Sequence, residues 1–198
     1  MTVKLNKPYP PGKTKIIHAI VDLLGQKDFA LITTSEIARV AGVTEGLIYK
    51  YFESKRDLLY QVLNEYFENF IDKCEQEVQE QHSPTEKLRT IIHHYIDTFD
   101  RSRVYARILL LEVRAFPCYF ESPAYAAVRR HSRIIRDIID DGIKTGEFRG
   151  DVSSSAIRDA MYGAIEHAVL PYICLNRKIN VNAMVDRVFN ILHKGIAP

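Results

Sequence analysis

The sequence has no tryptophan, only three cysteines and no long hydrophobic run. Cys74, Cys118 and Cys174 are far apart and include no Cys-x-x-Cys pair, which argues against a zinc knuckle and a disulfide-rich scaffold. No segment approaches the roughly 18 apolar residues of a membrane span. The polar, proline-bearing start at Met1–Gly12 does not resemble a signal peptide. We therefore expect a cytoplasmic protein in a reducing compartment, with no membrane partner.

Sequence patterns of common enzyme classes are also missing. There is no Gly-x-Ser-x-Gly elbow, no Gly-x-x-x-x-Gly-Lys phosphate loop and no Gly-x-Gly-x-x-Gly dinucleotide fingerprint. His93 and His94 are adjacent, and on a helix adjacent side chains point about 100° apart, which makes them a poor metal pair. We expect no enzyme activity, no metal and no cofactor, with an uncharacterised helical enzyme as an alternative.

Neither sign of charge dominates the 198 residues, because 27 Lys and Arg stand against 25 Asp and Glu, a small basic excess. Nucleic-acid binders usually show a marked basic excess, so the net charge of +2 argues weakly against one. The distribution is uneven, however. Residues 1–60 carry nine basic and six acidic side chains, a net of +3, and the rest of the chain has a net charge of −1. Any basic surface therefore belongs to the N-terminal part.

Almost every segment repeats its apolar residues with the 3.6-residue period of an α-helix, and no sustained strand alternation is present. The sequence therefore predicts an all-α fold. One helix begins at a capping box formed by Ser83 and Glu86, with Pro84 at its first position. Because its centre is apolar all round, the segment 101–116 is predicted to be a buried helix. Further helices are predicted at 14–24, 54–78, 122–142, 153–170 and 182–193.

Residues 33–52 differ from the rest because they contain two very short helices separated by a break. Thr33 and Glu36 form a capping box for the first helix, Gly42 makes the turn, and Thr44 can cap the second. Small or apolar residues occupy the positions where two steeply crossing helices pack. This pattern is typical of a helix-turn-helix, with an ordinary αα-corner as the alternative. The packing positions are Ile37, Ala38, Ala41, Val43 and Ile48.

The phrase Tyr49-Lys50-Tyr51-Phe52-Glu53-Ser54-Lys55, with Thr34-Ser35-Glu36-Ile37-Ala38 before it, closely resembles the tetracycline-repressor-like (TetR/AcrR) family of bacterial transcription regulators. The match covers the first third of the chain in detail, and the remainder agrees only in architecture. The resemblance implies a helix-turn-helix DNA-binding domain of three helices at 1–56 and a larger helical ligand-binding and dimerisation domain at 57–198. A helical interaction protein without DNA binding is the other alternative, but packing alone does not require the quoted phrase.

The resemblance further implies a ligand-responsive regulator, by the family's usual mode a repressor. It would bind a palindromic operator in double-stranded DNA as a homodimer, and a small-molecule effector would release it. The second short helix would enter the major groove. There Glu45 could accept a hydrogen bond from a cytosine amino group, and Gly46 would allow close approach of the backbone. The remaining contacts implied for DNA are Thr34, Ser35, Tyr49, Lys50, Tyr51 and Lys55.

Two of these residues have equally good structural interpretations. Tyr51 falls at an apolar position of the helix-turn-helix pattern, and Lys50 could be a solvated surface charge. The dimer has its own candidate surface, since small residues near Ala164 and Ala168 permit close helix approach. We predict that the helices 153–170 and 182–193 pair across a two-fold axis as a four-helix bundle.

The family resemblance implies a ligand pocket among the central helices, and the sequence gathers aromatic bulk there. The apolar composition favours an aliphatic, aromatic or acyl-type effector over a sugar or nucleotide. Aromatic stripes at helical spacing are more often ordinary core, and this alternative stays open. The candidate pocket residues are Phe67, Phe70, Tyr95, Phe99, Arg107, Glu112, Phe116, Tyr119, Tyr125, Tyr162 and His167.

Overall fold

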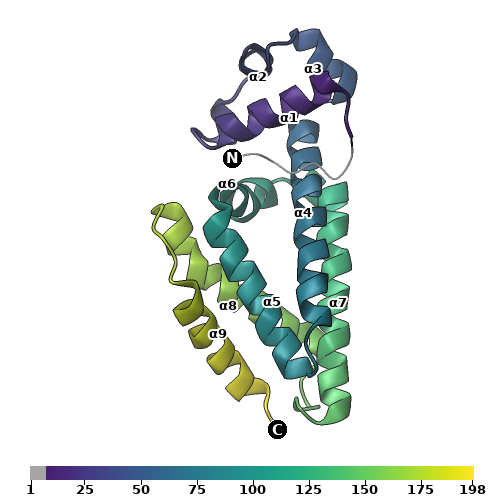
Figure 1. Ribbon diagram of the computed structural model, residues 1–198, viewed down its shortest axis with the longest axis vertical. Coiled ribbons are helices and arrows are strands. Elements are labelled where there is room, and N and C mark those ends of the chain that lie inside the picture. Colours follow the sequence, from purple (N-terminus) through teal and green to yellow (C-terminus); the bar gives the residue numbers. More distant parts are fainter. Residues whose placement is uncertain (1–7) are drawn as a thin grey trace. The chain divides into compact units, whose positions relative to one another are not determined.

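The computed structural model describes residues 8–198, and this part of the chain folds into α-helices joined by short turns, with no strand (Figure 1). The predicted all-α fold is therefore confirmed. The helices are α1 (Pro11–Leu24), α2 (Thr34–Ala41), α3 (Glu45–Tyr51), α4 (Lys55–Gln79), α5 (Pro84–Arg101), α6 (Arg103–Arg107), α7 (Pro123–Thr145), α8 (Ser154–Cys174) and α9 (Val181–Ile196). Among the described residues, no helix is long and apolar enough to cross a membrane.

The chain forms two compact units. The N-terminal unit contains the described residues up to Asn69 together with Leu111–Ala127, and the C-terminal unit contains Phe70–Leu110 and Val128–Pro198. Because the boundaries fall inside α4 and α7, each of these helices contributes to both units. The predicted division into functional domains at 1–56 and 57–198 stays a prediction.

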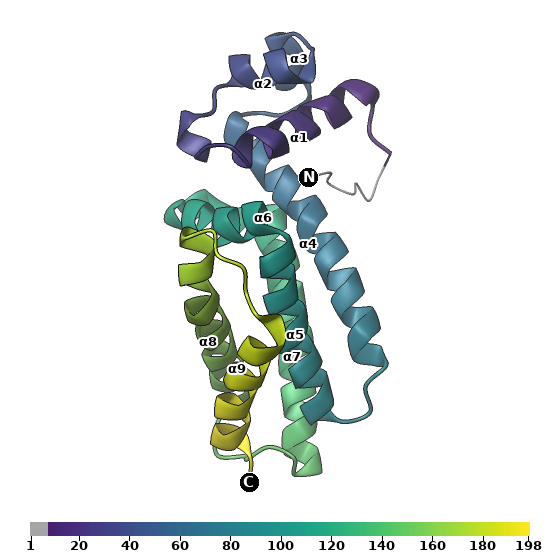
Figure 2. The ribbon, with the colours of Figure 1, turned by 60° about the vertical axis from the view of Figure 1, so that its left-hand side comes forward.

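In the N-terminal unit, α1 packs against both α2 and α3 (Figure 2). Ile16, Ile20, Ile37 and Ile48 are completely buried and join the three helices in one core. Gly42 has φ 63° and ψ 40°, a left-handed conformation that glycine adopts without steric cost, and it ends α2 at the predicted turn. Short helices cannot persist alone, so this shared core holds α2 and α3 in place.

The predicted caps of the two short helices are only partly correct. The Thr33 hydroxyl accepts a hydrogen bond from the Glu36 amide at 3.2 Å, as expected. The Glu36 carboxylate, however, pairs with Lys27 at 2.6 Å, and this contact lowers the pKa of Glu36. Thr44 occupies the N-cap position of α3 without a capping hydrogen bond from its side chain. The ion pair with Lys27, nine residues earlier in the chain, therefore takes the Glu36 carboxylate away from the capping role.

The segment 101–116 is not the single helix that the sequence predicts. The α-helix α6 is followed by a π-helical turn at Ile108–Glu112 and a 3-10 turn at Val113–Ala115, and Leu111 is 46% exposed. The chain passes from one compact unit to the other between Leu110 and Leu111. Because the segment packs into two different cores, its apolar residues do not have to lie on one continuous helical face. This accounts for the change from α-helical to π-helical and 3-10 turns.

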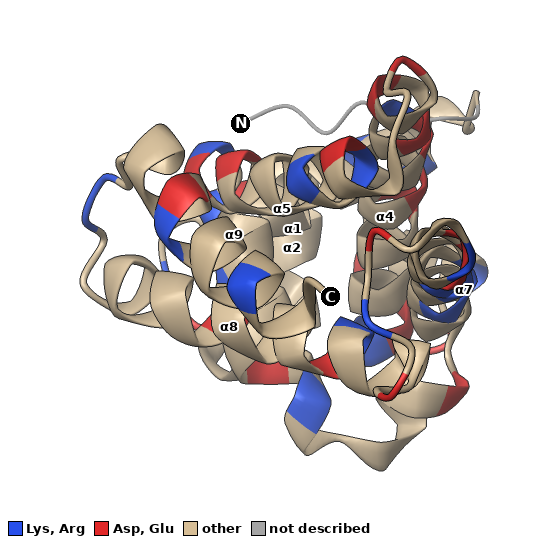
Figure 3. Cartoon of the chain, turned by 90° about the horizontal axis from the view of Figure 1, so that it is seen from below, with Lys and Arg blue, Asp and Glu red and all other residues tan. Residues whose placement is uncertain are grey.

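In the C-terminal unit, α5 packs against α8 and α9, which also pack against each other (Figure 2). The predicted capping box at the start of α5 is confirmed, because Ser83 Oγ accepts from the Glu86 amide at 3.1 Å and the Glu86 carboxylate accepts from the Ser83 amide at 3.0 Å. Basic and acidic residues are interspersed along α5 (Figure 3). This helix therefore offers no one-sign patch to a phosphate backbone.

The helix α8 continues past its predicted end at Leu170 and includes Pro171 in its last turn, up to Cys174. Proline lacks an amide hydrogen, so the backbone hydrogen bond that residue 171 would donate to the His167 carbonyl is lost, while the helix continues for three more residues. The carbonyl of Pro171 accepts from the Leu175 amide at 3.0 Å. The start of α8 is as predicted, with the Ser153 hydroxyl accepting from the Ala156 amide.

Candidate DNA-binding and ligand-binding sites

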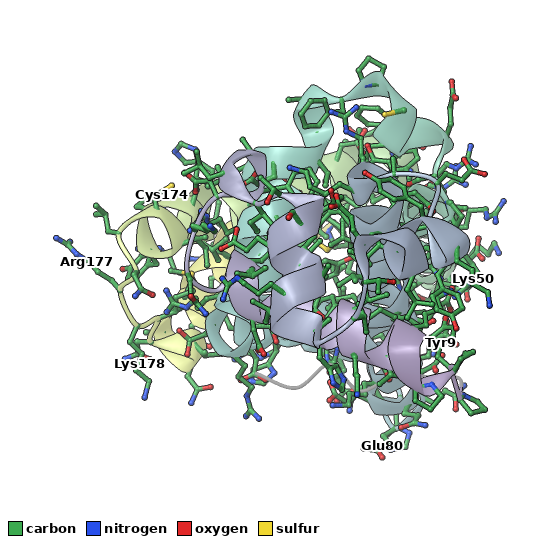
Figure 4. All side chains as sticks on the ribbon, turned by 90° about the horizontal axis from the view of Figure 1, so that it is seen from above. Tyr9, Lys50, Glu80, Cys174, Arg177 and Lys178 are labelled. Carbon is green, nitrogen blue, oxygen red and sulfur yellow. The ribbon has the colours of Figure 1, made fainter. Side chains whose placement is uncertain are left out.

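The helix α3 has one buried face and one exposed face. Ile48 is completely buried, whereas Glu45, Gly46, Tyr49 and Lys50 are exposed. Lys50 projects outward from the helix in the view from above (Figure 4). A helix that is held by its inner face and is bare on the outer one can enter a major groove.

A hydrogen-bond network holds the side chain of Glu45 at the start of α3. The Thr34 hydroxyl on α2 donates to the Glu45 carboxylate, and the Tyr49 hydroxyl donates to Thr34 Oγ1 at 3.4 Å. The network joins residues of both helices, so it fixes the carboxylate relative to the whole helix-turn-helix. Preorganisation of this kind lowers the entropy cost of binding.

Gly46 in α3 and Ser35 in α2 are both exposed. A side chain added at Gly46 would meet no atom within 4 Å, so packing inside the protein does not require glycine there. This open backbone fits the expectation of close approach by DNA. Ser35 is exposed in the first turn of α2 and has its hydroxyl available for a phosphate.

Tyr51 is half-buried and packs inside the module. Its ring meets that of the buried Phe52 edge to face, with 6.4 Å between centroids. It also lies beside α1, since a Cβ at Gly12 would be 3.8 Å from the ring of Tyr51. These contacts favour the packing interpretation, and its contact with DNA stays a prediction.

Lys55 has an internal role that its position in the sequence did not reveal. Its ammonium donates to the Phe29 carbonyl at 2.9 Å and the Ile32 carbonyl at 2.6 Å, and lies 4.3 Å from the centre of the Phe29 ring. Burial lowers the pKa of Lys55. The side chain thereby ties the start of α4 to the turn before α2. These two hydrogen bonds use two of the three N–H groups of the Lys55 ammonium, so one remains for a phosphate. The phosphate contact of Lys55 stays a prediction.

Two further hydrogen bonds in the N-terminal unit join α4 to Tyr9, which precedes α1, and to Lys13 in the first turn of α1. The Tyr9 hydroxyl donates to the Glu65 carboxylate at 2.5 Å, and Lys13 donates to Gln61 at 2.9 Å. Burial and the carboxylate raise the pKa of Tyr9 to about 12. These residues were not predicted from the sequence. Glu65 was the available signal, because a carboxylate on the buried side of a helix needs a hydrogen-bond donor from another element.

The eleven candidate pocket residues fall in both compact units. Phe67, Glu112, Phe116, Tyr119 and Tyr125 belong to the N-terminal unit, whereas the C-terminal unit contains the other six. In the N-terminal unit, Tyr119 and Tyr125 contact one another with 5.5 Å between ring centroids. Phe116 instead lies under the guanidinium of Arg56, 4.0 Å from its ring centre.

In the C-terminal unit, four of the candidates form an aromatic cluster. The ring of Tyr95 lies 4.7 Å from Phe70, 6.0 Å from Phe99 and 5.6 Å from Tyr162, as measured between centroids. The hydroxyls of Tyr95 and Tyr162 are 3.2 Å apart. Burial raises the pKa of both phenols, that of Tyr162 to about 12, so both stay protonated. The cluster therefore has an apolar body and one polar pair.

Two histidines that the sequence reasoning did not select complete this aromatic cluster. His94 is buried, with Nδ1 at 2.8 Å from Glu77 and Nε2 at 3.2 Å from the Phe70 carbonyl. His131 is 2% exposed and contacts the rings of Phe70 and Tyr95. The available signal for His131 was its place on the apolar stripe of α7.

Arg107 and His167 lie elsewhere in the C-terminal unit. Arg107 is half-buried at the end of α6. His167 is exposed on α8 and lines an apolar groove between α8 and α9. Four alanines at four-residue spacing form the α8 wall of this groove, and Ile191, 72% exposed, lies on the α9 wall. The alanines are Ala156, Ala160, Ala164 and Ala168.

Comparisons with known proteins agree along nearly the whole chain. The family model for bacterial regulatory proteins of the tetR family matches residues 16–62, and the model for the C-terminal region of YsiA-like proteins matches residues 63–195. The fatty acid metabolism regulator protein of Bacillus subtilis is 26% identical over 186 residues, which cover 94% of this chain and 96% of the relative.

Two solved structures share the fold. The fatty acid degradation regulator FadR from Bacillus halodurans has a TM-score of 0.84 at 23% identity, covering 96% of this chain and 98% of that one. FadR from Bacillus subtilis in complex with stearoyl-CoA has a TM-score of 0.83 at 26% identity, covering 92% of this chain and 98% of that one.

The fold and the exposed face of α3 define a helical DNA-binding protein of the helix-turn-helix class. The chain belongs to the TetR family of bacterial regulatory proteins. It is a ligand-responsive DNA-binding regulator and not an enzyme, and the alternatives that the sequence left open are not favoured.

Proposed function

We propose that this regulator binds a palindromic operator as a homodimer, represses transcription there, and is released by an acyl-type effector. The observation that carries the dimer is the apolar groove between α8 and α9. Exposing Ile191 and the neighbouring alanine stripe of α8 to water costs free energy. Pairing this face with the same face of a second chain would bury the apolar surface of both chains. Four helices, two from each chain, would then form the predicted bundle.

The effector class is supported by the aromatic cluster and by the relatives. The Phe70, Tyr95, Phe99 and Tyr162 rings offer an apolar surface with few polar atoms, which suits a hydrocarbon chain better than a sugar or nucleotide. The Bacillus subtilis relative is a fatty acid metabolism regulator protein, and the similar structure of FadR from Bacillus subtilis is a complex with stearoyl-CoA. A long-chain acyl-CoA is therefore the effector to test first.

The effector is tested by fluorescence anisotropy with a labelled duplex from the protein's own upstream DNA. We expect salt-sensitive, sequence-selective binding below micromolar concentration, and release of the DNA by micromolar stearoyl-CoA. Free coenzyme A is the matched control, because it carries the nucleotide without the acyl chain, and it should leave the complex intact. Release by coenzyme A alone, or no release by any acyl-CoA, would refute the acyl-type effector.

The proposed reading of bases rests on Thr34 and Glu45. We expect Glu45→Gln to change the preferred operator base at one position in each half-site, because an amide both donates and accepts where the carboxylate only accepts. Thr34→Val removes the hydroxyl that positions Glu45 and should reduce the discrimination at that same position by roughly 5–150-fold, corresponding to about 1–3 kcal/mol for a good base contact.

Binding selection from a randomised operator library measures both effects. Ser35→Ala is the matched control, because the exposed Ser35 hydroxyl is proposed to contact a phosphate. Removing this hydroxyl should lower the affinity for all DNA sequences equally. If Thr34→Val lowered affinity uniformly and left the base preferences of the wild type in place, the positioning role of Thr34 would be wrong.

A further inference from the structure

His131 lies at the centre of the aromatic cluster, where four helices each contribute a side chain. Phe70 from α4 and Tyr95 from α5 contact its ring, with 5.6 Å and 5.8 Å between centroids, and Tyr162 from α8 joins the cluster through Tyr95. The exposed fraction of His131 is only 2%. Neither of its ring nitrogens has a hydrogen-bond partner among the described residues.

The neighbouring His94 shows what a purely structural histidine looks like in the same cluster. Both of its ring nitrogens have partners, Glu77 on one side and the Phe70 carbonyl on the other. His131 is also buried, 2% exposed against 7% for His94, and has no such partners, although buried polar groups are nearly always hydrogen-bonded. A phenylalanine would fill the same space without the desolvation cost, so packing does not account for an imidazole at this position.

The His131 ring is neutral in the folded protein. Burial, together with the nearby His94 and Arg130, lowers its pKa to about 4. A neutral imidazole presents one N–H donor and one acceptor nitrogen on opposite sides of the ring. Such a ring matches a neutral oxygen, for example a hydroxyl or a keto group. It gives a carboxylate no charge to pair with.

We propose that His131 is a hydrogen-bonding contact for the effector, and that the preferred effector is an acyl chain bearing a hydroxyl or keto oxygen along its length. The inference rests on the proposed function, in which an acyl-type ligand binds this unit. It adds a polar specificity contact to an aromatic cluster that already contains the hydroxyl pair of Tyr95 and Tyr162. A plain hydrocarbon chain would leave both His131 nitrogens without partners in the bound state, whereas an oxygenated chain satisfies one of them.

The test compares stearoyl-CoA with the 3-, 10- and 12-hydroxystearoyl-CoA esters by isothermal titration calorimetry. We expect wild-type protein to bind one hydroxylated ester at least about 5-fold more tightly than stearoyl-CoA, in line with the worth of one buried hydrogen bond. His131→Phe should abolish this preference, and His131→Gln, which keeps a donor and an acceptor, should retain part of it. His93→Phe is the matched control, because His93 is exposed on α5, and it should keep the full preference.

Folding of the variants is checked by thermal unfolding, and we expect His131→Phe to be at least as stable as wild type. In wild-type protein labelled with ¹⁵N-histidine, the preferred ester should shift one buried imidazole signal, and that signal should be missing from His131→Phe. Equal binding of all esters by wild type, or the same preference in His131→Phe, would overturn the inference while leaving the acyl-type effector intact. If no acyl-CoA bound to wild type, the proposed effector class would itself fail, and the inference with it.

Discussion

The Ile191→Glu variant is expected to sediment as a monomer at micromolar concentration and to bind operator DNA about 100-fold more weakly than wild type, or worse. Ile191 is the most exposed large apolar side chain of the groove between α8 and α9. In the proposed dimer a glutamate at this position would be buried in an apolar interface, which penalises association through desolvation of its charge. Two reading modules joined in one dimer gain about 10²–10⁴ in affinity over a single one, and the monomer forfeits that gain.

The control for this variant is Asn190→Glu, which adds the same charge at the next position of α9. Asn190 is exposed and does not line the groove. The Asn190→Glu variant should therefore remain dimeric and bind the operator with near wild-type affinity. Sedimentation velocity and fluorescence anisotropy measure the two properties on the same samples. A dimeric Ile191→Glu variant that binds DNA normally would show that this groove is not the dimer interface.

Replacing Ile48 with alanine is expected to weaken operator binding by roughly 30-fold or more without affecting dimerisation. Ile48 is the only fully buried side chain of the seven-residue helix α3. Isoleucine-to-alanine changes in a core cost about 2–5 kcal/mol, and a helix of two turns has little other stability to draw on. The exposed face of α3 would then no longer be held in place for the major groove.

Ile48→Val provides the graded control, because it removes one methylene and costs about 0.5–1.5 kcal/mol. It should lower operator affinity by no more than about 10-fold. Effector binding, measured separately by calorimetry, should be the same in both variants, since α3 belongs to the N-terminal unit and the aromatic cluster to the other. If Ile48→Ala bound DNA as well as wild type, α3 would not be the recognition helix.

Features that depend on neighbours in the sequence could be predicted, and the capping box at Ser83 and Glu86 is an example. The left-handed turn at Gly42 is another, because only a few residue types adopt that backbone conformation easily. The helix-turn-helix could be predicted because its turn, the Thr33 cap and its packing positions lie within twenty residues. Short-range rules sufficed for these elements.

Features that depend on distant partners could not be predicted. Lys55 binds carbonyls that are 26 and 23 residues away, and no local pattern marks them as its acceptors. The capping role expected of Glu36 failed for the same reason, since Lys27 offers its carboxylate a stronger partner. The segment 101–116 changes its winding where the chain passes between two compact units, which periodicity within one segment cannot indicate.

The aromatic cluster contains residues that could be selected from the sequence and one, His131, whose role could not. Phe70, Tyr95, Phe99 and Tyr162 could be selected from the sequence because aromatic residues recur there at helical spacing. The place of His131 on the apolar stripe of α7 predicts its burial but not its lack of hydrogen-bond partners, because that depends on helices that meet only in the folded unit. A buried histidine is recognised as a ligand contact only when its surroundings are known.

The central claim, that two reading modules in one dimer bind the operator together, is tested most directly by the mass of the protein–DNA complex. Light scattering of the complex with a single operator duplex measures the number of chains bound. We predict two chains per duplex, or a multiple of two, with cooperative loss of all bound chains on addition of the acyl-CoA effector. One chain per duplex at saturating protein would contradict the account.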